Sequence, residues 1–453
     1  MGEAALDLVT RFVATLPDAS AFDLTGADDL TERFREPMPS APAAYDDVLA
    51  AIEEASLKGI DTAGPGFLGY IPAGGLIASA IAAFVGFAMN RFVNVWDAAP
   101  ALAQMEATVV RWIADMFEYP ADAQGILTSG GSLANFSAIV TARRTLLPDD
   151  FLAGTLYASE QTHHSVAKAA MLAGFPTRNV RLIGCTPELH IDVDELHDTV
   201  DADRRSGLQP FFICANGGTT NTGAVDPLEE LVRLAHERRM WIHVDAAYGG
   251  FFQLTDRGRR ALKGITGADS ITLDPHKGLF IPYGTGCLLV REGSTLRDSH
   301  RVRADYMQDL APQEINPSFS DYSPELTRDF RGLRVWVPLK LHGIDAFREA
   351  LDEKLDLAQH VADRLEATDG FEVPWRPELS VVAFRYLPRA GDRDDFNTAL
   401  LERINASGRV FLSSTRIGGR YMLRVCVLNH RTHADRVEEC IDIITRSAAE
   451  LDG

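Results

Sequence analysis

A lysine that directly follows a short apolar stretch is the first residue of this sequence that could do chemistry. Residues 270–273 (Ser-Ile-Thr-Leu) are rich in β-branched side chains and predict a strand, which Pro275 ends just before His276 and Lys277. A lysine that loses its proton on a rigid, partly buried element acts as an imine-forming nucleophile. An ordinary solvated surface lysine is the alternative at this point.

Two more predicted strands end in polar residues. Asp245 closes the apolar stretch 241–245, where its carboxylate could cap a helix, form an ion pair or bind the protonated ring nitrogen of a pyridine cofactor. The small Ala247 beside it would let a flat ring lie against the backbone. His163 follows the predicted strand 155–159. It could be an ordinary core or surface histidine, or it could stack on such a ring.

A glycine-rich turn joins another predicted strand to a helix. The turn 128–132 (Thr-Ser-Gly-Gly-Ser) contains Gly131 and Ser132, and a helical pattern begins directly after it. Glycines let a ligand approach the backbone, and a helix N-terminus offers free N–H groups to an anion, although many such turns only cap a helix. Together with the lysine, the carboxylate and the histidine, this turn suits an aldehyde cofactor that carries a phosphate and a pyridine nitrogen.

The elements that must position these residues alternate between strand and helix from about 124 to 295. Such alternation predicts an α/β fold with a mainly parallel sheet and helices on both faces, and ligands bind at the carboxyl ends of its strands. Residues 297–330 lack periodicity and predict a functional loop. The predicted domains are an N-terminal helical arm used in dimerisation at 1–75, a large cofactor domain at 76–345 and a small C-terminal domain at 346–453.

Composition excludes several classes of partner. The formal net charge of −20 disfavours nucleic acid and anionic membranes, which would repel the chain. The five cysteines are scattered without CxxC spacing, so neither a disulfide framework nor a zinc site is expected, and no other metal is expected. The first residues lack a basic segment that would mark a signal peptide, and no apolar run is long enough for a membrane span. A cytoplasmic, water-soluble protein is expected.

The sequence resembles the group II pyridoxal-phosphate-dependent amino acid decarboxylases, which include aromatic-L-amino-acid and glutamate decarboxylases. The resemblance covers about residues 30–450 and rests on 243–250 (His-Val-Asp-Ala-Ala-Tyr-Gly-Gly) and 274–277 (Asp-Pro-His-Lys). It implies a fold type I, aspartate aminotransferase-like enzyme with a seven-stranded, mainly parallel sheet, a smaller C-terminal α/β domain and an N-terminal helical arm. It also implies a homodimer with active sites at the subunit interface.

The resemblance assigns roles to the residues described above. Lys277 corresponds to the Schiff-base lysine, Asp245 to the partner of the pyridinium nitrogen, and Ala247 to a residue against the ring. His163 matches the ring-stacking histidine in the pattern Ser-x-Gln-x-His-x-Ser, which runs here from 159 to 165. Asp274 stands where aromatic decarboxylases more often carry Asn, so its contact with the phosphate stays open. The other implied cofactor residues are Gly131, Ser132, Thr220 and His276.

The implied reaction is the decarboxylation of an L-amino acid to its amine and carbon dioxide, with pyridoxal 5'-phosphate as cofactor. Tyr306, in the aperiodic loop, matches the family's proton donor to the substrate Cα, so the expected catalytic residues are Lys277, Tyr306 and His163. Family members with Phe at the Tyr306 position tend to be aldehyde synthases, so Tyr306 favours plain decarboxylation. An aldehyde synthase, another lyase of the same fold and a catalytically silent homologue are the alternatives.

The expected substrate is an aromatic or related L-amino acid. Phe67, Tyr70 and Pro72 resemble the family's aromatic side-chain pocket, and Phe92 and Asn94 align with residues that a partner subunit contributes. Aromatic-amino-acid decarboxylases typically carry a large apolar residue at the second of these two positions. The polar Asn94 therefore leaves open a substrate with a polar or acidic side chain.

Overall fold

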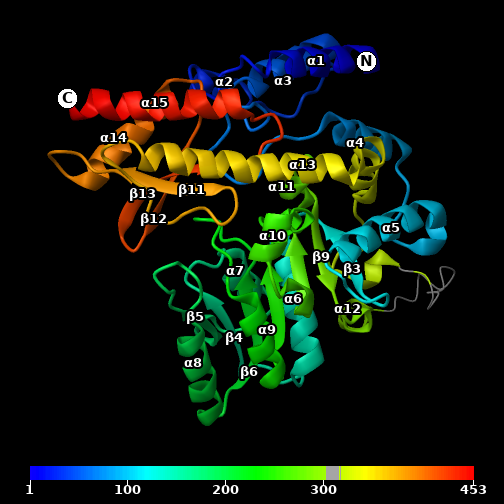
Figure 1. The fold of residues 1–453 in the computed structure, drawn as a ribbon. Helices are drawn as coiled ribbons and strands as arrows, with labels where there is room; N and C mark the ends of the chain where they lie inside the picture. Colours follow the sequence, from blue (N-terminus) through cyan, green and yellow to red (C-terminus); the bar gives the residue numbers. More distant parts are fainter. Residues whose placement is uncertain (303–315, 317) are drawn as a thin grey trace. The chain divides into compact units, whose positions relative to one another are not determined.

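The structure is a computed structural model that describes residues 1–302, 316 and 318–453. The chain forms two compact units. The first unit comprises residues 1–74, 356–376 and 380–453, and the second comprises residues 75–355 and 377–379. Each unit contains its own sheet (Figure 1). Each unit also has its own hydrophobic core.

The sheet of the second unit has seven strands in the order β3-β9-β8-β7-β6-β4-β5. Only β9 runs antiparallel to its neighbours β3 and β8, so all the other strands point the same way. This arrangement confirms the predicted mainly parallel sheet, and it brings the carboxyl ends of β3, β4, β6, β7 and β8 to one edge. The strands are β3 (Gln124–Thr128), β4 (Gly154–Ser159), β5 (Val180–Ile183), β6 (Gln209–Asn216), β7 (Trp241–Asp245), β8 (Ser270–Leu273) and β9 (Gly286–Val290).

Helices pack against this sheet, and α6 (Gly131–Leu146) is the one that the site depends on. Its buried face carries small side chains at Ala134, Ala138 and Ala142, one helical turn apart, which let the helix lie close to β8 and β9. The other helices are α4 (Ile77–Met89), α5 (Pro100–Met116), α7 (Ser165–Leu172), α8 (Val193–Arg205), α9 (Leu228–Glu237), α10 (Asp256–Ala261), α11 (Pro275–Gly278) and α12 (Gly293–His300). Short 3-10 turns lie at Trp96–Ala98, Thr177–Asn179, Gly250–Leu254, Ile265–Gly267 and Phe319–Asp321.

The first unit combines the N-terminal helices with a four-stranded antiparallel sheet in the order β10-β11-β13-β12. Backbone hydrogen bonds from Ala21 to Gly408 and from Leu68 to Phe411 tie the two parts of the chain together. The expected helical N-terminal segment and small C-terminal α/β portion are thus confirmed. The elements are α1 (Gly2–Thr15), β1 (Phe22–Asp23), α2 (Ala27–Arg33), α3 (Tyr45–Ser56), β2 (Gly59–Ile60), β10 (Phe371–Glu372), β11 (Val381–Tyr386), α14 (Arg393–Ala406), β12 (Ser413–Ile417), β13 (Arg420–Cys426) and α15 (Ala434–Asp452).

The long helix α13 (Gly332–Glu366) begins in the second unit and ends in the first. It bends at Gly343, whose φ of 72° is left-handed and favours glycine at this position. Among the described residues, no helix is both long enough and apolar enough to cross a membrane. The same part of the chain contains no cluster of three or more His, Cys, Asp or Glu side chains suited to a metal ion.

Candidate active site

Three of the predicted strand ends meet around Gly131. A Cβ atom placed on this glycine would lie 3.2 Å from Ala247 Cβ, which follows β7, and 3.2 Å from Asp274 Oδ2, which follows β8. Both distances are tighter than ordinary Cβ contacts, so only a glycine leaves this space open. Gly131 after β3, Ala247 after β7 and Asp274 after β8 therefore surround one small space, which we call the cradle.

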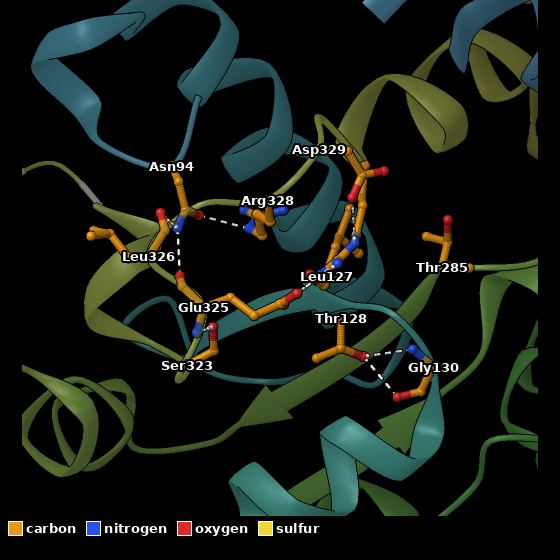
Figure 2. Close-up of polar contacts among 12 residues, drawn as sticks. Asn94, Leu127, Thr128, Gly130, Thr285, Ser323, Glu325, Leu326, Arg328 and Asp329 are labelled. Atoms are coloured by element: carbon orange, nitrogen blue, oxygen red, sulfur yellow. Dashed lines mark hydrogen bonds and ion pairs between the residues drawn. The ribbon is translucent and has the colours of Figure 1, made fainter. Parts of the chain in front are cut away.

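The N-terminus of α6 opens into this cradle. The helix begins at Gly131 behind Gly130, and no side chain caps its first N–H groups. Thr128 Oγ1, at the end of β3, donates to the Gly130 carbonyl at 3.0 Å and fixes the turn (Figure 2). Ser132 lies exposed in the first turn of the helix. Free N–H groups and the positive end of the helix dipole suit a phosphate at this position.

Lys277 lies one turn beyond β8, in α11, with 18% of its side chain exposed. Its Nζ atom lies 2.8 Å from Asp274 Oδ2, and the other carboxylate oxygen, Oδ1, is buried without a hydrogen-bond partner in the described part of the chain. His276 Nδ1 donates to the Thr285 carbonyl at 2.8 Å. Burial lowers the pKa of His276, the Asp274 carboxylate opposes that shift, and Nε2 lies 3.6 Å from Asp274 Oδ2.

Asp245 lies at the carboxyl end of β7 and is buried. Its Oδ2 accepts a hydrogen bond from the Asn135 amide at 2.8 Å, and its Oδ1 accepts one from the Ala247 backbone N–H at 3.2 Å. Asn135 belongs to the buried face of α6 and was not indicated by the sequence motifs. No signal in the sequence separates Asn135 from Ser137 and Thr141, the other buried polar residues of this helix.

His163 follows β4 and is half-buried. Its Nδ1 lies 2.8 Å from Ser165 Oγ and 3.3 Å from the Ser165 backbone N–H, which donates to it. Burial is the largest influence on His163 and lowers its pKa, and the Asp245 carboxylate opposes that shift. The ring is therefore neutral near pH 7 and available for stacking on a flat ligand.

Two other predicted residues are less defined by the structure. Thr220 lies beyond the end of β6 and is partly buried. Tyr306, the expected proton donor, falls outside the described residues. The roles predicted for both residues stay predictions.

The predicted aromatic pocket residues Phe67, Tyr70 and Pro72 belong to the first unit. Phe67 is buried and stacks on Phe411 with ring centroids 6.1 Å apart, whereas Tyr70 is 50% exposed. Pro72 is partly buried. Phe67 therefore belongs to a hydrophobic core, and Tyr70 is the member of this group with a ring surface available to a ligand.

The other two predicted pocket residues, Phe92 and Asn94, belong to the second unit, where Phe92 is partly buried and Asn94 is 1% exposed. Asn94 Nδ2 donates to the carbonyls of Glu325 and Leu326, both at 2.7 Å, and its Oδ1 accepts from Arg328 Nε at 2.6 Å (Figure 2). A polar contact between Asn94 and a substrate would have to replace one of these three hydrogen bonds.

Arg328 is one member of an arginine–carboxylate cluster that the sequence analysis missed. Arg328 pairs with the fully buried Glu106 of α5, Arg331 with Glu325 at 2.7 Å, and Arg334 with Asp329. Arg331 also donates to the Leu127 carbonyl of β3 at 3.0 Å, so the cluster anchors the segment before α13 beside the phosphate turn. The spacing of three residues between successive arginines was the available signal. The cluster consists of Glu106, Glu325, Arg328, Asp329, Arg331 and Arg334.

The cradle fits the expected cofactor. An uncapped helix N-terminus suits its phosphate, the buried Asp245 carboxylate suits its ring nitrogen, and the amine of Lys277 suits its aldehyde. The unpartnered Asp274 Oδ1 marks hydrogen-bonding capacity that the described residues leave unused. The arrangement can bind a phosphorylated pyridine aldehyde and hold it covalently.

Comparisons with known proteins agree with this geometry. The family model described as the pyridoxal-dependent decarboxylase conserved domain matches residues 28–387. The aromatic-L-amino-acid decarboxylase of Bacillus atrophaeus is 33% identical, with 100% of this chain and 95% of that protein covered. The structure of Oryza sativa TDC with PLP and tryptamine has a TM-score of 0.94 at 27% identity and covers 100% of this chain and 97% of that one. The structure of Rhodiola rosea 4-hydroxyphenylacetaldehyde synthase has a TM-score of 0.92 at 25% identity, with 100% and 98% covered. With its seven-stranded sheet and its lysine-bearing cradle, the chain belongs to the pyridoxal-dependent decarboxylases, enzymes of fold type I that use pyridoxal phosphate.

Proposed function

We propose that this protein decarboxylates an aromatic L-amino acid to the corresponding amine, with Lys277 as the residue that holds pyridoxal phosphate covalently. The observation that carries the proposal is the close approach of Gly131 to Ala247 and Asp274. It brings a helix N-terminus, a buried carboxylate and a lysine amine to one place. These are the three groups that the phosphate, the ring nitrogen and the aldehyde of the cofactor need.

Bound pyridoxal phosphate supplies an electron sink for the electron pair that remains when carbon dioxide leaves. The residues of the protein bind and position the cofactor. Asp245 would pair with the ring nitrogen, His163 would lie against the ring, and the N–H groups of Gly131 and Ser132 would hold the phosphate, with Thr220 and His276 as further contacts. Lys277 Nζ, which lies 2.8 Å from Asp274 Oδ2, would form the covalent bond to the aldehyde carbon.

An aromatic substrate is favoured by the relatives. Besides the enzyme of Bacillus atrophaeus, they include tryptophan decarboxylase 2 of Oryza sativa subsp. japonica, which is 29% identical over 96% of this chain. Within the first unit, Tyr70 offers an exposed ring, and we propose that it contacts the substrate side chain. Because both polar groups of Asn94 are engaged by its own protomer, we expect Asn94 to shape the pocket edge rather than to recognise a charged substrate.

The product depends on how the substrate Cα is protonated after decarboxylation. We propose Tyr306 as the donor, which would give an amine. Formation of an aldehyde is the second candidate, because the relatives include a phenylacetaldehyde synthase of Arabidopsis thaliana that is 26% identical over 99% of this chain. Tyr306→Phe should therefore shift the product from amine towards aldehyde. An unchanged amine yield would show that another residue donates the proton to Cα.

The test of the proposed function is a substrate panel. The protein loaded with pyridoxal phosphate is incubated separately with L-tryptophan, L-tyrosine, L-phenylalanine, L-glutamate and L-cysteine sulfinate. Carbon dioxide, amine, aldehyde, ammonia and hydrogen peroxide are then measured. We expect amine and carbon dioxide in equal amounts from at least one aromatic substrate, without hydrogen peroxide. Turnover of the acidic substrates alone would contradict the aromatic assignment, and aldehyde with hydrogen peroxide would establish the second candidate.

We further propose that the protein is a homodimer with active sites at the subunit interface. Helix α4 carries exposed apolar side chains, of which Phe84 and Phe87 are 64% and 62% exposed, an arrangement typical of a surface that a partner covers. The N-terminal arm, 1–75, is the second proposed dimer contact. Sedimentation should give twice the chain mass for the wild type and a lower mass for Phe84→Asp/Phe87→Asp. A fully active monomer would contradict the proposal.

We also propose a cytoplasmic location. All five cysteines are free, and four of them are buried, as expected of a protein that stays in a reducing compartment. Fractionation of the source cells with an antibody against the protein would test this location.

A further inference from the structure

A continuous chain of hydrogen bonds runs through the buried layer behind the cradle. It starts at Trp241, whose indole Nε1 donates to Ser270 Oγ at 2.8 Å. Ser270 Oγ lies 2.7 Å from His243 Nδ1, and His243 Nε2 lies 3.0 Å from Asn135 Oδ1. All four side chains are almost completely buried, so these hydrogen bonds are shielded from water.

The direction of each bond follows from the carboxylate at the far end. Asp245 Oδ2 can only accept, so the Asn135 amide turns its N–H groups towards Asp245 and its Oδ1 towards His243 Nε2. Burial lowers the pKa of His243 to about 4, which keeps the ring neutral. Its one proton then lies on Nε2 and is donated to Asn135 Oδ1, with Thr272 Oγ1 as a second neighbour at 3.3 Å. His243 Nδ1 therefore accepts from the Ser270 hydroxyl, which itself accepts from Trp241.

Both N–H groups of Asn135 point towards the active site as a result. One donates to Asp245 Oδ2 at 2.8 Å and the other to Ser165 Oγ at 3.0 Å. The opposite amide orientation would place Asn135 Oδ1 against the Asp245 carboxylate and two donors against each other at His243. It is therefore disfavoured on both sides of the amide.

The second branch ends on the ring-stacking histidine. Ser165 Oγ accepts from Asn135, so its hydrogen is free to be donated to His163 Nδ1 at 2.8 Å. The Ser165 backbone N–H also faces this nitrogen at 3.3 Å and adds to the preference for an unprotonated Nδ1. The neutral ring of His163 therefore carries its proton on Nε2.

We propose that Asn135 is a positioning residue that orients Asp245 and His163 at the same time, holding Asp245 Oδ2 as an acceptor and His163 in its Nε2–H form. The inference rests on the proposed function, because it assigns these two residues to opposite parts of one bound cofactor. The single Asn135 amide thus holds both the Asp245 carboxylate that would meet the ring nitrogen and the His163 ring that would stack on the cofactor.

Asn135→Leu tests the proposal, since it keeps a similar volume and removes both donors. Ser137→Ala is the matched control, because Ser137 lies on the same helix, is equally buried, and its Oγ is among the described side-chain atoms without a hydrogen-bond partner. Ser165→Ala removes only the His163 branch and is a milder change if Asn135→Leu folds poorly.

The first readout is the tautomer of His163 in the cofactor-free protein, measured by nitrogen-15 NMR of histidine-labelled protein and assigned with His163→Asn. We expect an unprotonated Nδ1 in the wild type and in Ser137→Ala, and a mixture of tautomers in Asn135→Leu and Ser165→Ala. A protonated Nδ1 in the wild type would overturn the proposal. This readout does not depend on the cofactor, so it stands even if the proposed function fails.

The second readout is the visible absorbance of the lysine-bound cofactor. In Asn135→Leu, the midpoint of its pH titration should move by about one pH unit, and the cofactor should dissociate about 10-fold more readily, as expected from the loss of a hydrogen bond to a charged group. The titratable groups that act on His163 from the surrounding elements are Asp245, His164, Lys277 and Asp274, and none is altered. Equal midpoints and equal retention in Asn135→Leu and Ser137→Ala would overturn the proposal. A wild type without the visible band would instead contradict the proposed function.

Discussion

Two groups of buried charges lie near the carboxyl end of β3, and they differ in how fully they neutralise themselves. In the arginine–carboxylate cluster, three arginines meet three carboxylates, and each arginine has a carboxylate partner. In the cradle, Lys277 pairs with Asp274, whereas Asp245 is held by the neutral Asn135 amide and the Ala247 N–H, and Asp274 Oδ1 has no partner among the described residues.

This difference separates a structural cluster from a binding site. The cluster balances its charges inside the protein, and its members stabilise one another and the segment before α13. Both groups contain a buried polar atom without a hydrogen-bond partner in the described residues, Arg328 Nη1 in the cluster and Asp274 Oδ1 in the cradle, but the cradle also contains a buried carboxylate, Asp245, that no described lysine or arginine neutralises. Changes in the cluster should therefore affect mainly stability, and changes in the cradle mainly cofactor binding and activity.

The largest expected effect is on the cradle side. Lys277→Ala should lower decarboxylation on the order of 10⁴-fold or more, because the covalent anchor is lost, and it should abolish the visible cofactor band. The control is Lys263→Ala, which removes an exposed lysine paired with Glu229. Ordinary turnover in Lys277→Ala would exclude this lysine as the anchor.

The opposite pattern is expected in the cluster. Glu106→Gln leaves Arg328 buried without its partner and should lower the free energy of unfolding by about 3–5 kcal/mol, measured by urea denaturation. The folded variant should retain the cofactor band. Asp115→Asn, an exposed position of the same helix, should cost less than about 1 kcal/mol. Equal losses in the two variants would remove the basis for treating the cluster as structural.

Low pH should destabilise the protein through its buried histidines, whereas the arginine–carboxylate cluster contains no histidine. Burial lowers the pKa of His243, behind the cradle, and of His300, at the end of α12, to about 4 each, below the roughly 6.5 of an unfolded histidine. The unfolded chain therefore gains protons below pH 6.5 that the folded chain does not accept, so stability falls as the pH falls from 7.5 to 5. Each histidine accounts for about 2 kcal/mol of this loss. His300→Gln should reduce the loss by that amount, and an unchanged pH slope would argue against a neutral buried His300.

The smallest effect is expected for Asn94. Its substitution tests whether a residue that is hydrogen-bonded to the cluster also contacts the substrate. Asn94→Ala removes its hydrogen bond to Arg328 and should lower the free energy of unfolding by about 1–2 kcal/mol. The ratio of kcat/KM for an aromatic and an acidic substrate should stay unchanged. A large change in that ratio would show that Asn94 contacts the substrate, as its alignment suggests, despite its hydrogen bonds within the protomer.

The sequence predicted the parts of the site that depend on local pattern. Lys277, Asp245 and His163 each follow a short strand that β-branched or apolar residues indicate, and parallel strands bring their carboxyl ends to one edge. The strand β9 between β3 and β8 was not anticipated, because a periodic pattern gives the presence of a strand but not its neighbours in the sheet.

The contacts that support the site could not be predicted in the same way. Glu106 and Arg328 are 222 positions apart, and Asn135 and Asp245 are 110 positions apart, so only the folded chain pairs them. Asn94 shows a second limit of prediction from sequence. Its polar side chain suggested a polar substrate, whereas in the structure the same polarity is used to hold Arg328 and the segment after residue 318.

The most direct test of the account is to locate the covalent anchor. The protein loaded with pyridoxal phosphate is treated with borohydride, which reduces the imine between cofactor and lysine to a stable amine, and its peptides are then mapped by mass spectrometry. We predict a single phosphopyridoxyl group on Lys277, with none on the control residue Lys263. A group on another lysine, or none on Lys277, would contradict the assignment of the cradle.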